Sequence, residues 1–203
     1  MLLSAYRQGI FPWYNPGERI LWWSPDPRFV VFFDELHVSR STARVMRNAS
    51  FDVSIDRDFP GVISRCATTP RPAQHGTWIT ADMREAYCDL HHLGYAHSCE
   101  VWQNDLLVGG VYGVALGRIF FGESMFSRVP NASKIALIRL CGFLEAAGYH
   151  LLDAQLRTAH VERMGGREIS RDNFLQRLER ALRYPTEQGS WSQRFSSESH
   201  CRR

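Results

Sequence analysis

The sequence predicts an α+β fold, in which helices cover a mixed and largely antiparallel sheet. Two patterns indicate this class. Three apolar runs joined by short turns stand between two helical patterns, as in an antiparallel meander. A further short apolar run then lies between two later helices, which adds a strand to the same sheet. The composition, 44% hydrophobic and 22% charged over 203 residues, is ordinary for a globular chain.

The first third of the chain has mixed patterns. Residues 2–8 resemble the last turns of a helix that ends at Gly9. The prolines and tryptophans that follow favour extended, turn-rich backbone. Residues 68–75 form a loop and the best internal boundary. Between these segments we expect strands over 28–33 and 52–55 and helices over 39–48 and 59–67.

The remainder is more regular, because helix caps and apolar stripes repeat at the expected spacing. Thr80 can cap a helix whose apolar stripe ends at Gly94. Asn131 can cap a long helix that ends at Gly148, and Ser170 can cap the last helix. The strands are expected over 97–102, 106–115, 118–122 and 150–156.

Charge and cysteine content restrict the function classes. The net charge is only +3, but residues 157–203 hold ten arginines against six acids. A basic end fits local contact with a polyanion, although a compositional bias toward arginine is the simpler explanation. No run approaches the ~20 apolar residues of a membrane helix, and the start lacks a signal-peptide pattern. Five cysteines without CxxC spacing favour a reducing cytoplasm without disulfides.

Three places could carry chemistry. In residues 120–127 a strand ends in a carboxylate, a hydroxyl and aromatic residues. In the apolar run 150–156, alternation places Asp153 and Gln155 on one face of a strand. Such groups need partners when buried: they line a cavity, or Asp153 binds the backbone of a loop. The third place is the tryptophan set, which could be core or a stacking platform for nucleotides.

Other motifs are less informative. The glycines at 109, 110 and 113 lie inside the meander, so they predict close strand packing or a bulge and no phosphate loop. His91, His92 and His97 lack an HExxH pattern, so no metal site is predicted. Ser124 has no histidine base nearby in the sequence, which disfavours a serine hydrolase.

Several runs, taken in order, resemble the leucyl/phenylalanyl-tRNA–protein transferases. The resemblance extends from Ala5 to about Phe174. Its main motifs are AYRQGIFPW (5–13), WWSPDPR (22–28), GTWIT (76–80), GESMFS (122–127) and NASK (131–134), followed by Asp153 and Gln155. Several long motifs in one order are far more specific than any single motif.

The resemblance implies an activity and its partners. The family moves leucine or phenylalanine, and sometimes methionine, from a charged tRNA to a protein with an N-terminal arginine or lysine, which marks that protein for degradation. No metal or diffusible cofactor is used. We expect a cytoplasmic monomer. We also expect three segments: residues 1–33 as a remnant of a small N-terminal domain, 34–187 as an acetyltransferase-like catalytic domain, and 188–203 as a loose tail.

The resemblance also assigns roles to residues. Gln155 and Asp153 would lie at the acceptor amine, with Asp153 orienting Gln155. Glu123 would fix the terminal adenosine or the aminoacyl amine, and Asp153 and Glu123 are the first candidates to meet the basic acceptor residue. The implied substrate contacts are Trp13 and Trp78 at the adenine, Phe120 and Met125 at the leucine or phenylalanine side chain, and Gly122 and Ser127 beside them.

Two further points accompany the resemblance. Family members usually carry another N-terminal segment before these motifs. Here Met1 falls inside the first helix of the pattern. Either the start site is mis-assigned or the protein is naturally trimmed. The alternatives are a non-catalytic relic that binds tRNA or peptide, and an acyl-CoA N-acetyltransferase. Candidate phosphate contacts, chosen from charge alone, are Arg40, Arg44, Arg47 and the C-terminal arginines.

Overall fold

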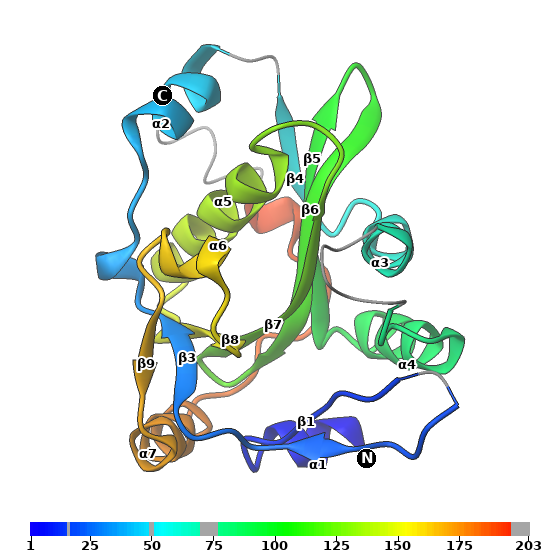
Figure 1. The fold of residues 1–203 in the computed structure, drawn as a ribbon, viewed down its shortest axis with the longest axis vertical. Helices are drawn as coiled ribbons and strands as arrows, with labels where there is room; N and C mark the ends of the chain where they lie inside the picture. Colours follow the sequence, from blue (N-terminus) through cyan, green and yellow to red (C-terminus); the bar gives the residue numbers. More distant parts are fainter. Residues whose placement is uncertain (16, 49–50, 70–76, 196–203) are drawn as a thin grey trace.

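The computed structural model describes residues 1–15, 17–48, 51–69 and 77–195. A seven-stranded sheet in the order β4-β5-β6-β7-β8-β3-β9 runs through the molecule (Figure 1). All neighbouring strands are antiparallel except β7 and β8. The predicted α+β class with a mixed sheet is therefore confirmed. The strands are β3 (Arg28–Val31), β4 (Asp52–Ile55), β5 (Ala96–Gln103), β6 (Leu106–Leu116), β7 (Ile119–Ser127), β8 (Leu151–Gln155) and β9 (Arg167–Ile169).

Helices cover both faces of this sheet. Helices α3 and α4 lie on one face and α5 and α6 on the other (Figure 1), and a separate apolar cluster fills each side. A small hairpin of β1 (Phe11–Pro12) and β2 (Trp22–Trp23) lies beside α1. The helices are α1 (Leu2–Tyr6), α2 (Arg40–Asn48), α3 (Phe59–Thr68), α4 (Ala81–His92), α5 (Ala132–Ala146), α6 (Ala159–Glu162) and α7 (Arg171–Ala181), with a 3₁₀ turn at Phe33–Glu35.

Two of the three predicted helix caps are confirmed. The Thr80 side chain accepts a hydrogen bond from Met83 N, and that of Ser170 accepts one from Asn173 N. Asn131 stands at the start of α5, but its side chain makes no capping hydrogen bond and its backbone is left-handed, with φ at 69°. Asparagine tolerates this conformation better than most residues, so it serves the tight turn into the helix.

Strand β3 lies inside the main sheet, between β8 and β9. Its first residue, Arg28, is directly opposite Ile169 of β9, and Val30 is opposite Asp153 of β8. Residues 28–31 thus belong structurally to the sheet, although the boundary expected after residue 33 groups them with the N-terminal segment. In this arrangement Arg28 is completely buried, with 0% exposure.

Strand β7 is longer than predicted, because it continues through the whole GESMFS run to Ser127. Its register with β6 shifts between the pairs Tyr112↔Ser124 and Gly113↔Gly122, so Glu123 is the extra residue of a bulge. A side chain at Gly113 would lie 2.1 Å from the carbonyl oxygen of Phe121. The predicted role of a meander glycine in a bulge is therefore confirmed.

The residues after α7 return to the sheet. Trp191 is only 2% exposed, and its indole stacks on the ring of His97 with 3.5 Å between centroids. Its backbone N donates to Asp56 Oδ2 over 2.8 Å, and Asp56 also pairs with His97 Nδ1 at 2.9 Å. Residues 188–195, expected to be part of a loose tail, are thus held against β5; residues 196–203 lie outside the described part of the chain.

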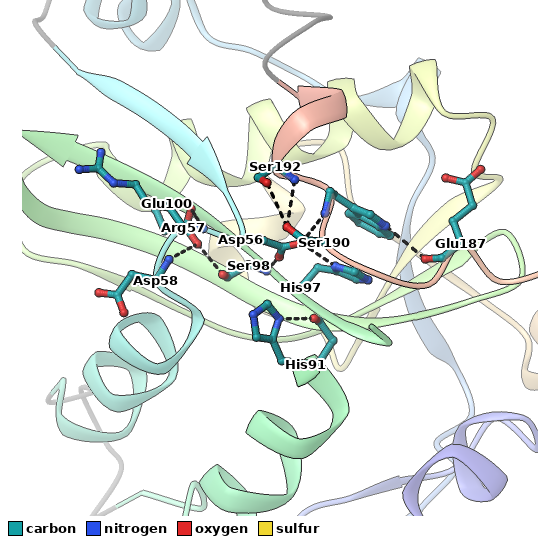
Figure 2. A network of polar contacts seen from close by, with 12 residues as sticks. Asp56, Arg57, Asp58, His91, His97, Ser98, Glu100, Glu187, Ser190 and Ser192 are labelled. Atoms are coloured by element: carbon teal, nitrogen blue, oxygen red, sulfur yellow. Dashed lines mark hydrogen bonds and ion pairs between the residues drawn. The ribbon is translucent and has the colours of Figure 1, made fainter. Parts of the chain in front are cut away.

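A buried carboxyl group lies next to this contact. Glu100 is 0% exposed and accepts hydrogen bonds from Ser54 Oγ at 2.6 Å and Ser98 Oγ at 2.5 Å. Burial raises the pKa of Glu100 to about 7, although these hydroxyls partly stabilise its charge. Figure 2 shows Asp56, His97 and Glu100 in one polar network at this edge of the sheet.

Within the described residues, no helix is long and apolar enough to cross a membrane. The same part of the chain holds no group of three or more His, Cys, Asp or Glu residues that could bind a metal ion. Cys66, Cys88, Cys99 and Cys141 form no disulfide there, while Cys201 lies outside it.

Candidate active site

The two parallel strands of the sheet diverge at its centre. Strand β7 pairs with β8 only from Ile119↔Leu151 to Phe121↔Asp153, and both strands continue beyond this point. A cavity of about 430 Å³ lies where they separate. Residues 122–127 of β7 form one wall, while Leu152 and Ala154 of β8 contribute to the opposite wall. Helices α5 and α6 also contribute to the lining, through Ser133, Leu137, His160 and Val161.

The cavity is mainly apolar with polar groups at its border. Its apolar lining includes Val111, Met125, Leu137, Leu152 and Val161. Polar lining residues are Thr69, Glu123, Ser124, Ser127, Ser133, Thr158 and His160. Such a lining suits an apolar group that carries a few polar atoms at one end.

Glu123 is held by three hydrogen bonds. The hydroxyl of Tyr6 donates to Oε1 at 2.7 Å and that of Tyr87 donates to Oε2 at 2.8 Å. Gln155 Nε2 also donates to Oε1, over 2.8 Å. The two tyrosine hydroxyls lie 2.5 Å from each other. These four side chains come from α1, α4, β7 and β8, so the cluster joins the N-terminal helix to the sheet.

The environment of Glu123 changes its acidity. Burial raises its pKa to about 7, and the charge of Asp153 acts in the same direction. Hydrogen bonds from Tyr6, Tyr87 and Gln155 oppose part of this rise. Burial also raises the pKa of both tyrosines well above the usual value, so their hydroxyls stay protonated as donors. Glu123 can thus exchange a proton near neutral pH, as general bases do.

Asp153 forms a buried ion pair. Arg28 binds it through two hydrogen bonds, Nε to Oδ1 at 2.8 Å and Nη2 to Oδ2 at 2.6 Å, and both side chains are 0% exposed. The rings of Phe11 and Phe174 lie 4.8 and 4.5 Å from the guanidinium carbon. Such an ion pair needs good geometry to offset desolvation, and the aromatic rings add cation–π contacts.

Gln155 links the two carboxyl groups. Its backbone N donates to Asp153 Oδ1 at 2.9 Å, and its side-chain Nε2 donates to Glu123. Its φ of 64° lies in the left-handed region, at the last position of β8. Because the amide nitrogen faces a carboxylate, the amide oxygen must face the other way. Among the described residues, no donor forms a hydrogen bond with that oxygen.

The structure brings together most of the predicted site residues. Asp153, Gln155 and Glu123 form one connected network. Gly122, Glu123, Met125 and Ser127 line the cavity. The Ser127 hydroxyl donates to Val129 O and accepts from Ser133 N, so it also fixes the start of α5.

Three predicted contact residues lie elsewhere. Phe120 is 0% exposed in the apolar cluster beneath α5 and is not a cavity-lining residue. Trp78 is 7% exposed and belongs to the opposite cluster, together with Tyr6 and Tyr87. Trp13 is half-buried against that same cluster and its ring lies 6.0 Å from that of Trp23. Both predicted adenine contacts are therefore on the Tyr6 side of the sheet.

Sequence reasoning missed Arg28, Tyr6 and Tyr87 as site residues. Both tyrosines belong to apolar stripes of their helices, and that pattern concealed their hydroxyls. A buried tyrosine hydroxyl usually needs a polar partner, which was the available signal. Arg28 stands in the WWSPDPR run, but its partner Asp153 is 125 positions away, so local sequence gives no sign of the pair.

An apolar cavity at the fork of two strands, lined by a carboxyl group with a pKa of about 7 that is hydrogen-bonded to Gln155, is compatible with an acyltransferase. Comparison with known proteins identifies the class of transferase. The family model for leucyl/phenylalanyl-tRNA protein transferase matches residues 30–179, and the model for its N-terminal domain matches residues 1–26. The chain belongs to this family and is an aminoacyltransferase.

Curated relatives agree with this assignment. The leucyl/phenylalanyl-tRNA–protein transferase of Syntrophus aciditrophicus is 56% identical over 191 residues, which are 94% of this chain and 80% of the relative. The protein of the same name from Anaeromyxobacter dehalogenans is 54% identical over 94% of this chain and 82% of its own length. That of Pseudomonas entomophila is 54% identical over 91% and 81%.

Two solved structures show a more distant similarity. A functionally unknown conserved protein from Staphylococcus epidermidis matches with a TM-score of 0.48 at 10% identity, over 71% of this chain and 57% of its own. L-PGS from Bacillus licheniformis matches with a TM-score of 0.42 at 12% identity, over 81% and 58%.

Proposed function

We propose that this chain transfers leucine or phenylalanine from the 3′ end of a charged tRNA to the N-terminal arginine or lysine of an acceptor protein. The observation that carries the proposal is the hydrogen bond from Gln155 to Glu123 at the border of the apolar cavity. It places a hydrogen-bond acceptor and a proton acceptor side by side. Family membership supplies the reaction class.

The cavity takes the side chain of the transferred amino acid. Met125, Leu137 and Leu152 surround it with flexible apolar groups. Methionine adapts to both aliphatic and aromatic neighbours, which suits a pocket for leucine and phenylalanine. Burial of one such side chain contributes about 1.5–3 kcal/mol, so the cavity discriminates mainly through shape and against charged side chains.

The reaction is the aminolysis of an ester. The α-amine of the acceptor attacks the ester carbonyl carbon; a C–N bond forms, the C–O bond to the ribose breaks, and the amine loses a proton. Gln155 Oε1 accepts a hydrogen bond from the amine and aligns its lone pair. Glu123, with its pKa of about 7, takes the proton, which finally reaches the leaving ribose oxygen. Because the ester is already activated, positioning supplies much of the rate.

Asp153 acts as a positioning residue. Its carboxylate is occupied by Arg28 and by the backbone N of Gln155, so it fixes Gln155 in its left-handed conformation. Glu123, which lines the cavity, is then the acidic group that meets the basic acceptor. We place Phe120 behind the cavity as support for its wall.

The RNA end of the donor extends along the Tyr6 side. Trp13 and Trp78 are the aromatic residues there that border the terminal adenine, as stacking platforms do in other RNA-binding proteins. We propose that the chain acts as a monomer in the cytoplasm, where charged tRNA is found. Exposed Arg40, Arg44 and Arg47 of α2 meet phosphates of the acceptor stem.

The decisive experiment supplies the purified chain with leucyl-tRNA and an arginine-starting peptide. Mass spectrometry should show one added leucine. The same peptide starting with alanine should remain unmodified. Asp153→Asn should lower turnover while tRNA binding persists. The proposal would be abandoned if neither this chain nor an N-terminally extended version transferred leucine, or if either acetylated the peptide from acetyl-CoA instead.

A further inference from the structure

A second cavity adjoins the first one on the side of the sheet that α5 and α6 cover. It has a volume of about 310 Å³ and is lined by the segment that enters α2, the first turns of α5 and the end of α6. Trp13 and Trp78, which we place at the adenine, belong to the cluster on the opposite face (Figure 1). Among the described residues, His160 of α6 alone lines both cavities. The second cavity therefore lies beyond the aminoacyl cavity as seen from the adenine.

Helix α5 presents one row of side chains to each cavity. Ser133 and Leu137 line the first cavity, and Lys134 and Ile138, which follow them by one position, line the second. Residues four apart lie on the same side of a helix, so these are two neighbouring rows. Because His160 contributes to both linings from α6, its imidazole is the partition between the two cavities.

The partition separates an apolar cavity from a cationic one. Lys134 and Arg163 line the second cavity, and no aspartate or glutamate is among its lining residues. Within the described part of the chain, neither cation has a carboxylate within 4.0 Å. The nearby acid Glu162 is already bound by Arg157 at 2.7 Å. A carboxylate that entered the second cavity would therefore meet two cations that have no counter-ion from the protein.

The helix that carries the imidazole is fixed, and the ring is neutral. The Thr158 side chain caps α6 by accepting a hydrogen bond from Val161 N, and Val161 is only 5% exposed. Burial lowers the pKa of His160 below its usual value of 6.5, and the charges of Lys134 and Arg163 lower it further, so the ring is mostly uncharged at pH 7. The Nε2 atom is buried and has no hydrogen-bond partner among the described residues. Replacement of the ring therefore breaks no hydrogen bond at this atom.

We propose that His160 determines the length of the side chain that the aminoacyl site accepts, because its ring closes the end of that site against the cationic cavity. The inference rests on the proposed transfer of leucine or phenylalanine. Both of these side chains end on the apolar side of the partition, and a side chain extended at the para position of phenylalanine meets the ring. Without the ring the two cavities are continuous, and a longer side chain that ends in a carboxylate can bind Lys134 and Arg163 through charge-assisted hydrogen bonds.

The test compares adenosine 3′-esters of phenylalanine and of 4-carboxyphenylalanine as donors. The wild-type chain should transfer phenylalanine and reject the longer, charged side chain. His160→Ala should raise kcat/KM for 4-carboxyphenylalanine by about tenfold or more, the usual effect of gaining one hydrogen bond to a charged group. His160→Phe, which keeps a ring in the partition, should retain the rejection.

A second substitution separates charge from size. In the double variant His160→Ala/Lys134→Gln most of the gain for 4-carboxyphenylalanine should be lost, because one of the two cations is gone. The 4-acetylphenylalanine ester has a side chain of similar size without a charge, so its transfer should improve in His160→Ala whether or not Lys134 is replaced. A gain for 4-carboxyphenylalanine that persists in full in the double variant overturns the inference.

A matched control lies on the opposite face of the sheet. His92 of α4 is exposed and lines neither of the two cavities. His92→Ala makes the same chemical change and should leave the preference among the three esters unchanged. Thermal unfolding of all variants shows whether they are folded when assayed. Equal preferences in His160→Ala and His92→Ala contradict the role of the partition.

A binding measurement separates this inference from the proposed function. Amide analogues, in which 3′-amino-3′-deoxyadenosine carries phenylalanine or 4-carboxyphenylalanine, resist transfer and are titrated by calorimetry. His160→Ala should gain affinity for the 4-carboxyphenylalanyl analogue, and the inference fails if its preference equals that of the wild type. If His160→Ala shows this gain while the wild-type chain transfers no leucine, the proposed function alone is refuted.

Discussion

Gln155 donates a hydrogen bond from its side-chain nitrogen to Glu123 over 2.8 Å, although the two residues lie 32 positions apart on neighbouring strands. The contact forms at the point where β7 and β8 cease to pair. It orients the amide nitrogen toward Glu123, and it joins that amide to a carboxyl group whose pKa is about 7. This contact and three other features of the structure lead to predictions that can be measured.

The first concerns the pH dependence of transfer. Only ionised Glu123 can accept a proton, so the transfer rate should increase as the pH rises through about 7. Glu123→Gln keeps the shape and should lower the rate about 100-fold, within the range for general bases. The remaining pH dependence of the Glu123→Gln rate should come only from deprotonation of the acceptor α-amine, near pH 8. Steady-state rates of both proteins from pH 5.5 to 9 test this. If the transfer rate of Glu123→Gln falls below pH 7 in the same way as that of the wild type, Glu123 is not the proton acceptor.

The second concerns the buried pair of Arg28 and Asp153. Arg28→Met leaves Asp153 charged and without its partner, which should reduce the free energy of unfolding by about 3–5 kcal/mol. The double variant Arg28→Met/Asp153→Leu should recover stability without recovering transfer, because Gln155 loses its fixed position. Urea titration provides the measurement. Arg157→Met, at an exposed ion pair, is the control and should behave as the wild type.

The third concerns stability and pH at Glu100. Its pKa is raised from 4.5 to about 7 in the folded chain, so the folded state holds a proton that the unfolded state releases. The free energy of unfolding should therefore fall as the pH rises from about 4.5 to 7, by about 3 kcal/mol from this residue. Glu100→Gln should remove that part of the decrease. Glu179→Gln, which changes an exposed carboxylate, should leave the decrease as it is in the wild type. If Glu100→Gln and the wild type showed the same dependence of unfolding free energy on pH, the decrease would not come from Glu100.

The fourth concerns the C-terminal contact. Trp191→Ala removes a buried indole from His97 and should cost about 3–5 kcal/mol, as large-to-small core substitutions do. Trp22→Ala, at a 37% exposed tryptophan, should cost much less. Equal urea midpoints for the two variants would show that residues 188–195 are dispensable for the fold.

Local patterns predicted much of the fold. The meander, the caps at Thr80 and Ser170 and the shared face of Asp153 and Gln155 depend on neighbours within a few residues, which the sequence displays directly. The short α6 and β9 escaped prediction, because four and three residues are too few for a periodic signal. Residues 123–127 were expected to follow a strand. They belong to β7 instead, because the pairing of β7 with β6 continues beyond the bulge at Glu123.

The site was predictable only in part. The resemblance supplied Glu123, Asp153 and Gln155, and alternation placed the last two on one face. The sequence allowed two roles for Asp153, lining a cavity or binding the backbone of a loop. In the structure its main partner is instead the side chain of Arg28. The second cavity was also hidden, since its lining comes from three segments that meet only after folding.

The contact between Trp191 and His97 has a consequence for synthesis. Every strand of the sheet precedes residue 191 in the chain, so each one leaves the ribosome before the indole that covers Asp56 and His97. Until then the aspartate–histidine pair faces water, and this edge of the nascent protein is unfinished. Translation must therefore pass α7 and reach residue 191 before the contact with His97 can form.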